Sequence, residues 1–135
     1  LFLEFLTQEW ILTLALLVVV IMLIMHEARK SGPSVSPQQA INLINHDSAI
    51  VVDVCEPKEY AQGHVPNAIN IPLGSLSSRI NELEKYKGKP IVVACRAGNR
   101  SMKGAIALSK NGFESVYSLS GGLTAWQKGN LPVEK

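Results

Sequence analysis

Seven residues around the second cysteine combine the side chains that a sulfur nucleophile needs. The stretch CRAGNRS, residues 95–101, places Cys95 beside Arg96 and Arg100, among small residues. The thiolate is the reactive form of cysteine, and nearby cations stabilise it. A buried structural cysteine behaves as a small hydrophobe and gains nothing from arginine neighbours. The stretch therefore favours a reactive Cys95, with an unreactive cysteine beside two solvated arginines as the alternative.

The residues after Cys95 have the composition of a tight anion-binding turn. Ala97, Gly98 and Asn99 are small or tolerate unusual backbone angles, so successive N–H groups can point inward. The turn leads into a predicted helix, and the first amides of a helix attract anions. A thiolate at the centre of such a turn would be stabilised by the same amides.

The elements around this turn alternate between strand and helix. Short β-branched runs predict strands, and apolar residues at helical spacing predict helices. Ser36, Pro37 and Gln39 fit the start of a first helix. The expected strands cover residues 49–54, 68–72, 90–95 and 115–119, and further helices cover residues 56–63, 75–86, 99–112 and 123–128. This alternation predicts an α/β domain with a central parallel sheet flanked by helices. Ligands of such sheets bind beyond the carboxyl ends of the strands, where Cys95 falls.

Charge and cysteine content exclude several classes of protein. A net charge of +2 is too balanced to predict a nucleic-acid partner. Two cysteines are too few for a disulfide-scaffolded secreted module. The histidines at positions 26, 46 and 64 have no metal-ligand spacing with each other or with the cysteines. We therefore expect neither a metal nor another cofactor.

The amino-terminal segment is apolar on all sides. Residues 10–25, WILTLALLVVVIMLIM, carry no charge, and extension back to Phe5 gives the length that a bilayer requires. Trp10 suits a membrane interface, and Arg29 with Lys30 predicts a cytoplasmic carboxyl-terminal side. We expect a single-pass anchor in the cell (inner) membrane, with the catalytic domain facing the cytoplasm. A cleaved signal peptide or a buried hairpin is the alternative, although the preceding residues carry no base.

The chain is accordingly expected to have three parts. Residues 1–30 form the transmembrane anchor with its basic flank, and residues 31–37, rich in Ser, Pro and Gly, form a linker. Residues 38–135 form the catalytic domain. Both cysteines would then lie in a reducing compartment as free thiols.

Three motifs in order resemble the rhodanese-like sulfurtransferase family, in its single-domain form with an amino-terminal membrane anchor. VDVCEPKEYAQGHVPNAINIP (52–72) looks like the family's first signature, CRAGNRS like its active-site loop and GGLTAW (121–126) like its terminal motif. The resemblance covers roughly residues 34–133. It implies the rhodanese fold for residues 38–135, with Cys95 as the residue that carries a persulfide. The substrate-binding residues that the resemblance implies are Arg96, Ala97, Gly98, Asn99, Arg100 and Ser101.

The resemblance also implies the chemistry. The spacing from Cys95 to Arg100 is Cys-x4-Arg, as in sulfurtransferases, whereas related phosphatases have Cys-x5-Arg. We expect transfer of sulfur from thiosulfate or a persulfide to a thiol or cyanide. The partners would be a small sulfur-containing anion or low-molecular-weight thiol, the membrane and a protein sulfur acceptor. The alternative is a membrane-tethered sulfur-carrier or docking module with little turnover.

One position departs from the family pattern. Cys55 stands where the family usually has arginine, so a positive charge near the site is missing. Cys55 could attack a persulfide on Cys95 and form a disulfide, but a neutral substitution at a strand end is the favoured interpretation. Asp53, at the same strand end, is a secondary candidate for acid–base chemistry, with a structural role favoured.

Overall fold

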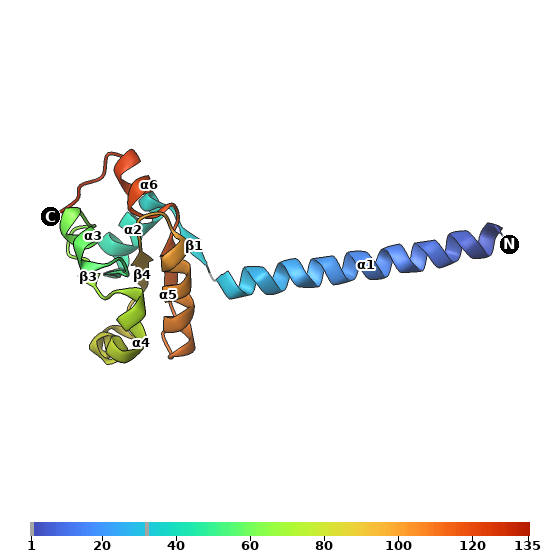
Figure 1. Ribbon diagram of the computed structural model, residues 1–135, viewed down its shortest axis with the longest axis horizontal. Coiled ribbons are helices and arrows are strands. Elements are labelled where there is room, and N and C mark those ends of the chain that lie inside the picture. The colour runs from blue at the N-terminus through green and yellow to red at the C-terminus, as the bar shows by residue number, and fades with distance from the viewer. Residues whose placement is uncertain (1, 32) are drawn as a thin grey trace. The chain divides into compact units, whose positions relative to one another are not determined.

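The computed structural model describes residues 2–31 and 33–135, which form two compact units, residues 1–30 and 31–135. The first unit is the continuous helix α1 (Phe2–Ser31) (Figure 1). Its stretch Thr7–His26 is long and apolar enough to cross a membrane, and every large apolar side chain from Trp10 to Met25 is exposed. Thr13 donates its hydroxyl to the carbonyl of Glu9 at 2.7 Å, so this polar group is satisfied within the helix.

The second unit is built on one five-stranded parallel sheet, in the order β1-β5-β4-β2-β3. The expected α/β fold with a parallel sheet is therefore confirmed. The strands are β1 (Ser34–Val35), β2 (Ile50–Asp53), β3 (Ile69–Asn70), β4 (Ile91–Ala94) and β5 (Val116–Leu119). The connecting helices are α2 (Pro37–Asp47), α3 (Pro57–Gln62), α4 (Leu76–Arg79), α5 (Asn99–Lys110) and α6 (Gly122–Lys128). Two 3₁₀ segments, η1 (Leu73–Ser75) and η2 (Ile80–Tyr86), flank α4.

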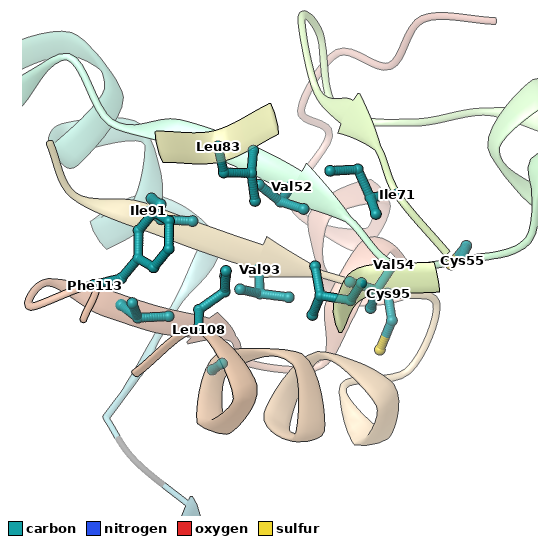
Figure 2. Close-up of a cluster of buried hydrophobic side chains, with 13 residues drawn as sticks. Val52, Val54, Cys55, Ile71, Leu83, Ile91, Val93, Cys95, Leu108 and Phe113 are labelled. Atoms are coloured by element: carbon teal, nitrogen blue, oxygen red, sulfur yellow. The ribbon is translucent and has the colours of Figure 1, made fainter. Parts of the chain in front are cut away.

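Both faces of the sheet are covered, which explains the short runs of β-branched residues. On one face, Val52 and Val93 pack with Leu83 of η2 and Leu108 of α5 (Figure 2). On the other face, Val51 and Val92 belong to a second cluster with residues of α2 and α6, including Ala40 and Trp126. Because β4 lies at the centre of the sheet, all four of its residues are buried. Cys95 directly follows this most enclosed strand.

The first helix of the unit begins as its sequence predicts. The amide of Gln39 donates to the Ser36 hydroxyl, and the Gln39 side chain accepts from the Ser36 amide. Pro37 occupies the first turn, where its missing N–H costs nothing. This capping box fixes the point at which the chain turns from β1 into α2.

The segment expected to be a linker, residues 31–37, departs from that expectation. Ser34 and Val35 form the edge strand β1, which pairs with Ser118 and Leu119 of β5. Val35 belongs to the second buried cluster. It is the apolar residue of this otherwise polar stretch, and its burial accompanies the pairing of the segment with the sheet. A two-residue strand has no periodicity that a sequence pattern could reveal.

The helix expected over residues 75–86 also differs. Its first part forms α4, but Ile80–Tyr86 is the 3₁₀ segment η2. Leu76 and Leu83 are both completely buried. The apolar spacing therefore predicted the buried face correctly but could not distinguish a continuous α-helix from a tighter turn.

Candidate active site

Cys95 lies at the carboxyl end of the central strand. Its side chain is only 2% exposed, and Figure 2 shows its sulfur pointing toward the start of α5. Asp53, the last residue of the neighbouring strand β2, pairs in register with Ala94. The two strand ends that the sequence singled out therefore lie side by side, one carrying Cys95 and the other Cys55.

The turn after Cys95 directs a backbone amide at its sulfur. The N–H of Gly98 donates to Cys95 Sγ at 2.9 Å. Gly98 has a φ of 103°, in the left-handed region that glycine tolerates without strain, and this conformation turns the amide inward. The bond is short enough to stabilise negative charge on the sulfur.

The start of α5 adds to this stabilisation. Asn99 is the first residue of a 12-residue helix, and the first amides of a helix have no acceptor within it. Their N–H groups and the helix dipole create a positive end beside the sulfur. Ala97 and Asn99 are exposed at the rim of the turn, while Gly98 and Ser101 are buried beneath it.

Arg100 is held by a carboxylate from α3. Its Nη1 and Nη2 donate to the two carboxylate oxygens of Glu59 at 2.7 and 2.9 Å. The hydrogen bonds from Arg100 hold the pKa of Glu59 at about 2, and the same pairing raises the pKa of Arg100. Glu59 also accepts from the amide of Glu56 in the capping box of α3. This single carboxylate therefore ties the start of α3 to the active-site turn.

Arg96 shares the same carboxylate much more loosely. Its Nε lies 3.8 Å from Glu59 Oε2, and its Nη2 donates to Gln62 Oε1 at 3.3 Å. About half of the Arg96 side chain is exposed. Two guanidinium groups thus lie near one carboxylate, and both carboxylate oxygens are bonded to Arg100. Within residues 33–135, the charge of Arg96 is therefore left without a paired carboxylate at hydrogen-bond distance.

Helix α6 supports the turn from behind. The amide of Leu123 donates to the carbonyl of Cys95 at 2.8 Å, and the amide and hydroxyl of Thr124 donate to the carbonyl of Arg96 at 3.1 and 3.0 Å. Gly122 makes this approach feasible, because a Cβ there would contact the Cys95 carbonyl and come within 2.7 Å of Arg96. The backbone of Cys95 and Arg96 is therefore fixed by bonds to a separate helix.

A pair of buried serines holds the peptide of Gly98. Ser101 Oγ donates to the carbonyl of Gly98 at 2.9 Å and lies 2.8 Å from Ser118 Oγ. Since a hydroxyl has one proton and Ser101 uses its own on Gly98, Ser118 must donate to Ser101. Strand β5 thereby helps to hold Gly98, the residue whose N–H faces the sulfur, through the carbonyl on its other side.

Sequence comparison agrees with this geometry. Residues 36–129 match the family described as the rhodanese-like domain. The chain belongs to this family. The uncharacterized protein YibN of Escherichia coli K12 is 33% identical over 129 residues, covering 95% of this chain and 88% of YibN. The thiosulfate sulfurtransferase GlpE of Actinobacillus pleuropneumoniae is 33% identical over 100 residues, covering 74% of this chain and 91% of GlpE.

A solved structure supports the fold independently. The rhodanese-related protein of Thermoplasma volcanium superposes with a TM-score of 0.69 at 31% identity, covering 76% of this chain and 98% of its own. The match to YibN spans more residues than the second unit contains, so it includes part of α1. The expected family is therefore confirmed.

In this rhodanese-like domain, the second strand end is held by backbone bonds. The buried carboxylate of Asp53 accepts from the amide of Cys55 at 2.9 Å. Asn70 of β3 donates to the carbonyls of both residues, at 3.0 and 2.9 Å. The Asp53 carboxylate therefore bonds to the backbone at the strand end, and its structural role stays a prediction.

Cys55 itself is a poor nucleophile in this setting. Burial raises the pKa of its thiol to about 12, and the neighbouring Asp53 carboxylate adds to the shift. Both cysteines are free thiols. Because only the thiolate attacks sulfur, the raised pKa argues against Cys55 as a partner of Cys95.

Several residues that shape the site had no assigned role in the sequence. Glu59, Gly122 and Thr124 fall within the recognised motifs, but only their contacts show that they hold the arginines and the turn. Ser118 lies in no motif, and a single serine in a buried strand gives no signal of its own. Within residues 2–31 and 33–135, no three His, Cys, Asp or Glu side chains are grouped to hold a metal.

Proposed function

We propose that this protein is a sulfurtransferase that carries sulfur as a persulfide on Cys95. The observation that carries the proposal is the 2.9 Å bond from the Gly98 amide to Cys95 Sγ, at the start of α5. This arrangement stabilises a thiolate and the anionic sulfur that replaces it. The amides of residues 96–100 and the two arginines would bind the anionic substrate.

The reaction has two balanced steps. In the first, the Cys95 thiolate attacks the outer sulfur of thiosulfate, the bond between the two thiosulfate sulfurs breaks, and sulfite leaves with that electron pair. With a persulfide donor, a thiolate leaves instead. In the second, a thiolate or cyanide attacks the outer sulfur on Cys95, which departs again as the thiolate. Neither of these steps transfers a proton, because Cys95 attacks as a thiolate and leaves as a thiolate.

The size of the turn favours sulfur over phosphate. Only four residues separate Cys95 from Arg100, and the Gly98 amide already points at the sulfur. A tetrahedral phosphate needs a wider ring of donors around the thiolate than a terminal sulfur atom does. We therefore expect no hydrolysis of phosphate esters.

A sulfur carrier with little turnover is the second candidate function. Cys95 is 2% exposed, and a sulfur so enclosed is protected from free small molecules. In this role, the persulfide would pass to a protein acceptor that opens or covers the turn. The two functions share the Cys95 persulfide and differ in how fast small acceptors discharge it.

The same proposal places the domain at a membrane. The exposed apolar stretch Thr7–His26 would anchor the chain in the inner membrane, and the basic residues after it favour a cytoplasmic domain. A retained anchor predicts that the full-length protein stays with membranes after alkaline washing. Release of a shorter soluble form would support a cleaved signal peptide.

Steady-state kinetics of the full-length protein in detergent test the activity. With thiosulfate and cyanide varied independently, double-reciprocal plots should give parallel lines, the pattern of a covalent two-step mechanism. Cys95→Ser should show only the background rate. Intersecting lines, or activity that persists in Cys95→Ser, would contradict the persulfide mechanism.

A further inference from the structure

A polar pocket of about 250 Å³ lies beside the active-site turn, between α3 and α6. Apart from Arg96, its walls are formed by residues that the proposed reaction does not use. The lining residues are Gln62 and Gly63 at the end of α3, Arg96 of the turn, and Leu123, Thr124 and Gln127 of α6. Arg96 is the only ionised side chain among these six, so the pocket carries a positive charge.

The hydrogen-bonding groups of the pocket are mostly donors. Gln62 uses its carbonyl oxygen to accept from Arg96, so its NH₂ group is what it can offer a ligand. Thr124 uses its hydroxyl proton on the Arg96 carbonyl. The Arg96 guanidinium and the NH₂ group of Gln62 therefore offer N–H donors to the cavity, and Gln127 can turn its own NH₂ group toward a ligand. A planar carboxylate matches such a set of donors.

The charge of Arg96 remains effective because its acidic neighbour is already neutralised. Glu59 binds Arg100 through both oxygens at 2.7 and 2.9 Å, whereas its closest approach to Arg96 is 3.8 Å. Nη2 of Arg96 donates to Gln62 at 3.3 Å, which leaves Nη1 and the second N–H of Nη2 for a carboxylate that enters the pocket. Arg96 can bind it in the bidentate manner that arginine prefers.

The pocket is also connected directly to the nucleophile. Leu123 and Thr124 in its wall donate their amides to the carbonyls of Cys95 and Arg96, at 2.8 and 3.1 Å. Arg96, which would anchor the ligand, directly follows Cys95 in the chain. We propose that this pocket binds the carboxylate of a small thiol acceptor and directs its sulfur to the Cys95 persulfide. This inference rests on the proposed function and specifies the acceptor as an anionic, carboxylate-bearing thiol.

The transfer itself is balanced. The acceptor thiolate forms a bond to the outer sulfur of the persulfide, the bond between that sulfur and Cys95 breaks, and Cys95 leaves as a thiolate. The acceptor departs as a persulfide, and its carboxylate takes no part in bond making. The pocket therefore determines which thiols react, without changing how the sulfur moves.

Three small thiols of different charge test the proposal on full-length protein in neutral detergent. They are 3-mercaptopropionate, 2-mercaptoethanol and cysteamine, which are anionic, neutral and cationic. The persulfide form, freed of donor, is mixed with each thiol, and the rate constant of its discharge is measured. Gln127→Glu places a negative charge in the pocket, while Lys128→Gln lowers the net charge equally at the next position of α6, outside the lining.

We expect Gln127→Glu to slow discharge by 3-mercaptopropionate about three- to fivefold, relative to its effect on 2-mercaptoethanol. Cysteamine should not be slowed, and Lys128→Gln should leave the ratio between the thiols unchanged. Arg96→Gln should abolish the preference for the anionic thiol. Equal effects of Gln127→Glu on all three thiols, or equal effects of Gln127→Glu and Lys128→Gln, would overturn the proposal.

A binding measurement separates this inference from the proposed function. Cys95→Ser cannot carry a persulfide, but its pocket should still bind the carboxylate. Its Gln62 and Gln127 side-chain amide resonances should shift saturably with 3-mercaptopropionate and not with 2-mercaptoethanol. Such shifts without any persulfide in the native protein would refute the sulfur chemistry alone, whereas a persulfide without shifts would refute the pocket.

Discussion

Glu59 binds Arg100 through both carboxylate oxygens, at 2.7 and 2.9 Å, and so joins α3 to the turn that carries the nucleophile. The bonds from Arg100 hold the pKa of Glu59 at about 2, below its usual 4.5. A depressed pKa means that the folded state favours the ionised carboxylate. The pair therefore stabilises the protein above about pH 4.5, and this stabilisation is lost as the pH falls toward 2.

Removal of this charge should destabilise the protein in a pH-dependent way. Glu59→Gln keeps a side chain that can complete the capping box of α3 but loses the ionic bonds. At neutral pH, we expect the free energy of unfolding in urea to fall by about 2 kcal/mol. Near pH 2 to 3, the difference from the native protein should shrink strongly.

Glu82→Gln provides the matched control for this experiment. Glu82 pairs with Arg79 through two bonds of 2.7 and 3.1 Å, but both side chains are solvent-exposed. Such surface pairs contribute little to stability. We expect no resolvable change at either pH. A loss in Glu59→Gln that is the same at neutral and acidic pH would contradict the role of its charge.

A methyl group at Gly122 should disrupt the active-site turn. Its φ is +59°, and a Cβ would meet the backbone of Cys95 and Arg96, which cannot move aside as a flexible side chain can. Gly122→Ala should lower the free energy of unfolding by about 3 kcal/mol and reduce sulfur loading of Cys95. Gly88→Ala is the control, since its Cβ would have no neighbour within 4 Å. Equal stability of these two variants would refute the close contact.

Loss of the Ser118 hydroxyl should loosen the support beneath Gly98. Ser118→Ala removes the donor to Ser101 Oγ inside the core, and we expect a loss of about 1 to 2 kcal/mol in unfolding free energy. Ser78→Ala removes a hydroxyl of similar bonding, 3.0 Å from the carbonyl of Ser75, but at the surface. That control should change stability by less than about 0.5 kcal/mol. A Ser118→Ala variant as stable as Ser78→Ala would show that the buried pair is not needed.

Cys55 should be chemically inert in the folded protein. With its pKa raised to about 12, the thiol stays protonated at neutral and mildly alkaline pH. In Cys95→Ser, where Cys55 is the remaining cysteine, iodoacetamide should label the protein only after unfolding. Rapid labelling of the folded variant at about pH 8 would show instead that Cys55 is an accessible nucleophile. It would return a Cys55–Cys95 disulfide to consideration.

The parts of the fold that depend on residues close together in the chain could be predicted from the sequence. Buried strands such as Ile91–Ala94 are continuous apolar runs, and the capping box at Ser36 and Gln39 needs only three residues to act. The edge strand Ser34–Val35 was missed, because its pairing with β5 depends on residues far away in the chain. The same limit applies to Ile80–Tyr86, where burial of Leu83 follows from spacing but the 3₁₀ geometry does not.

The candidate site was likewise predictable only where it depends on residues close together in the chain. Cys95 and the two arginines could be identified from one short stretch of sequence. Their residue types and spacing alone indicate the chemistry of the turn. Glu59, which binds Arg100, lies 36 residues before Cys95, and Ser118, which supports the turn through Ser101, lies 23 residues after it. Only the packing of α3 and β5 against the turn brings them into contact. The pocket beside Arg96 is likewise formed by two helices that no motif connects.

The intact mass of the full-length protein after brief treatment with thiosulfate is the most direct test of a persulfide on Cys95. We expect a gain of one sulfur atom that is absent in Cys95→Ser, retained in Cys55→Ala and removed by cyanide. A native protein that gains no sulfur from thiosulfate or from a persulfide donor would contradict the assignment of Cys95 as a persulfide carrier.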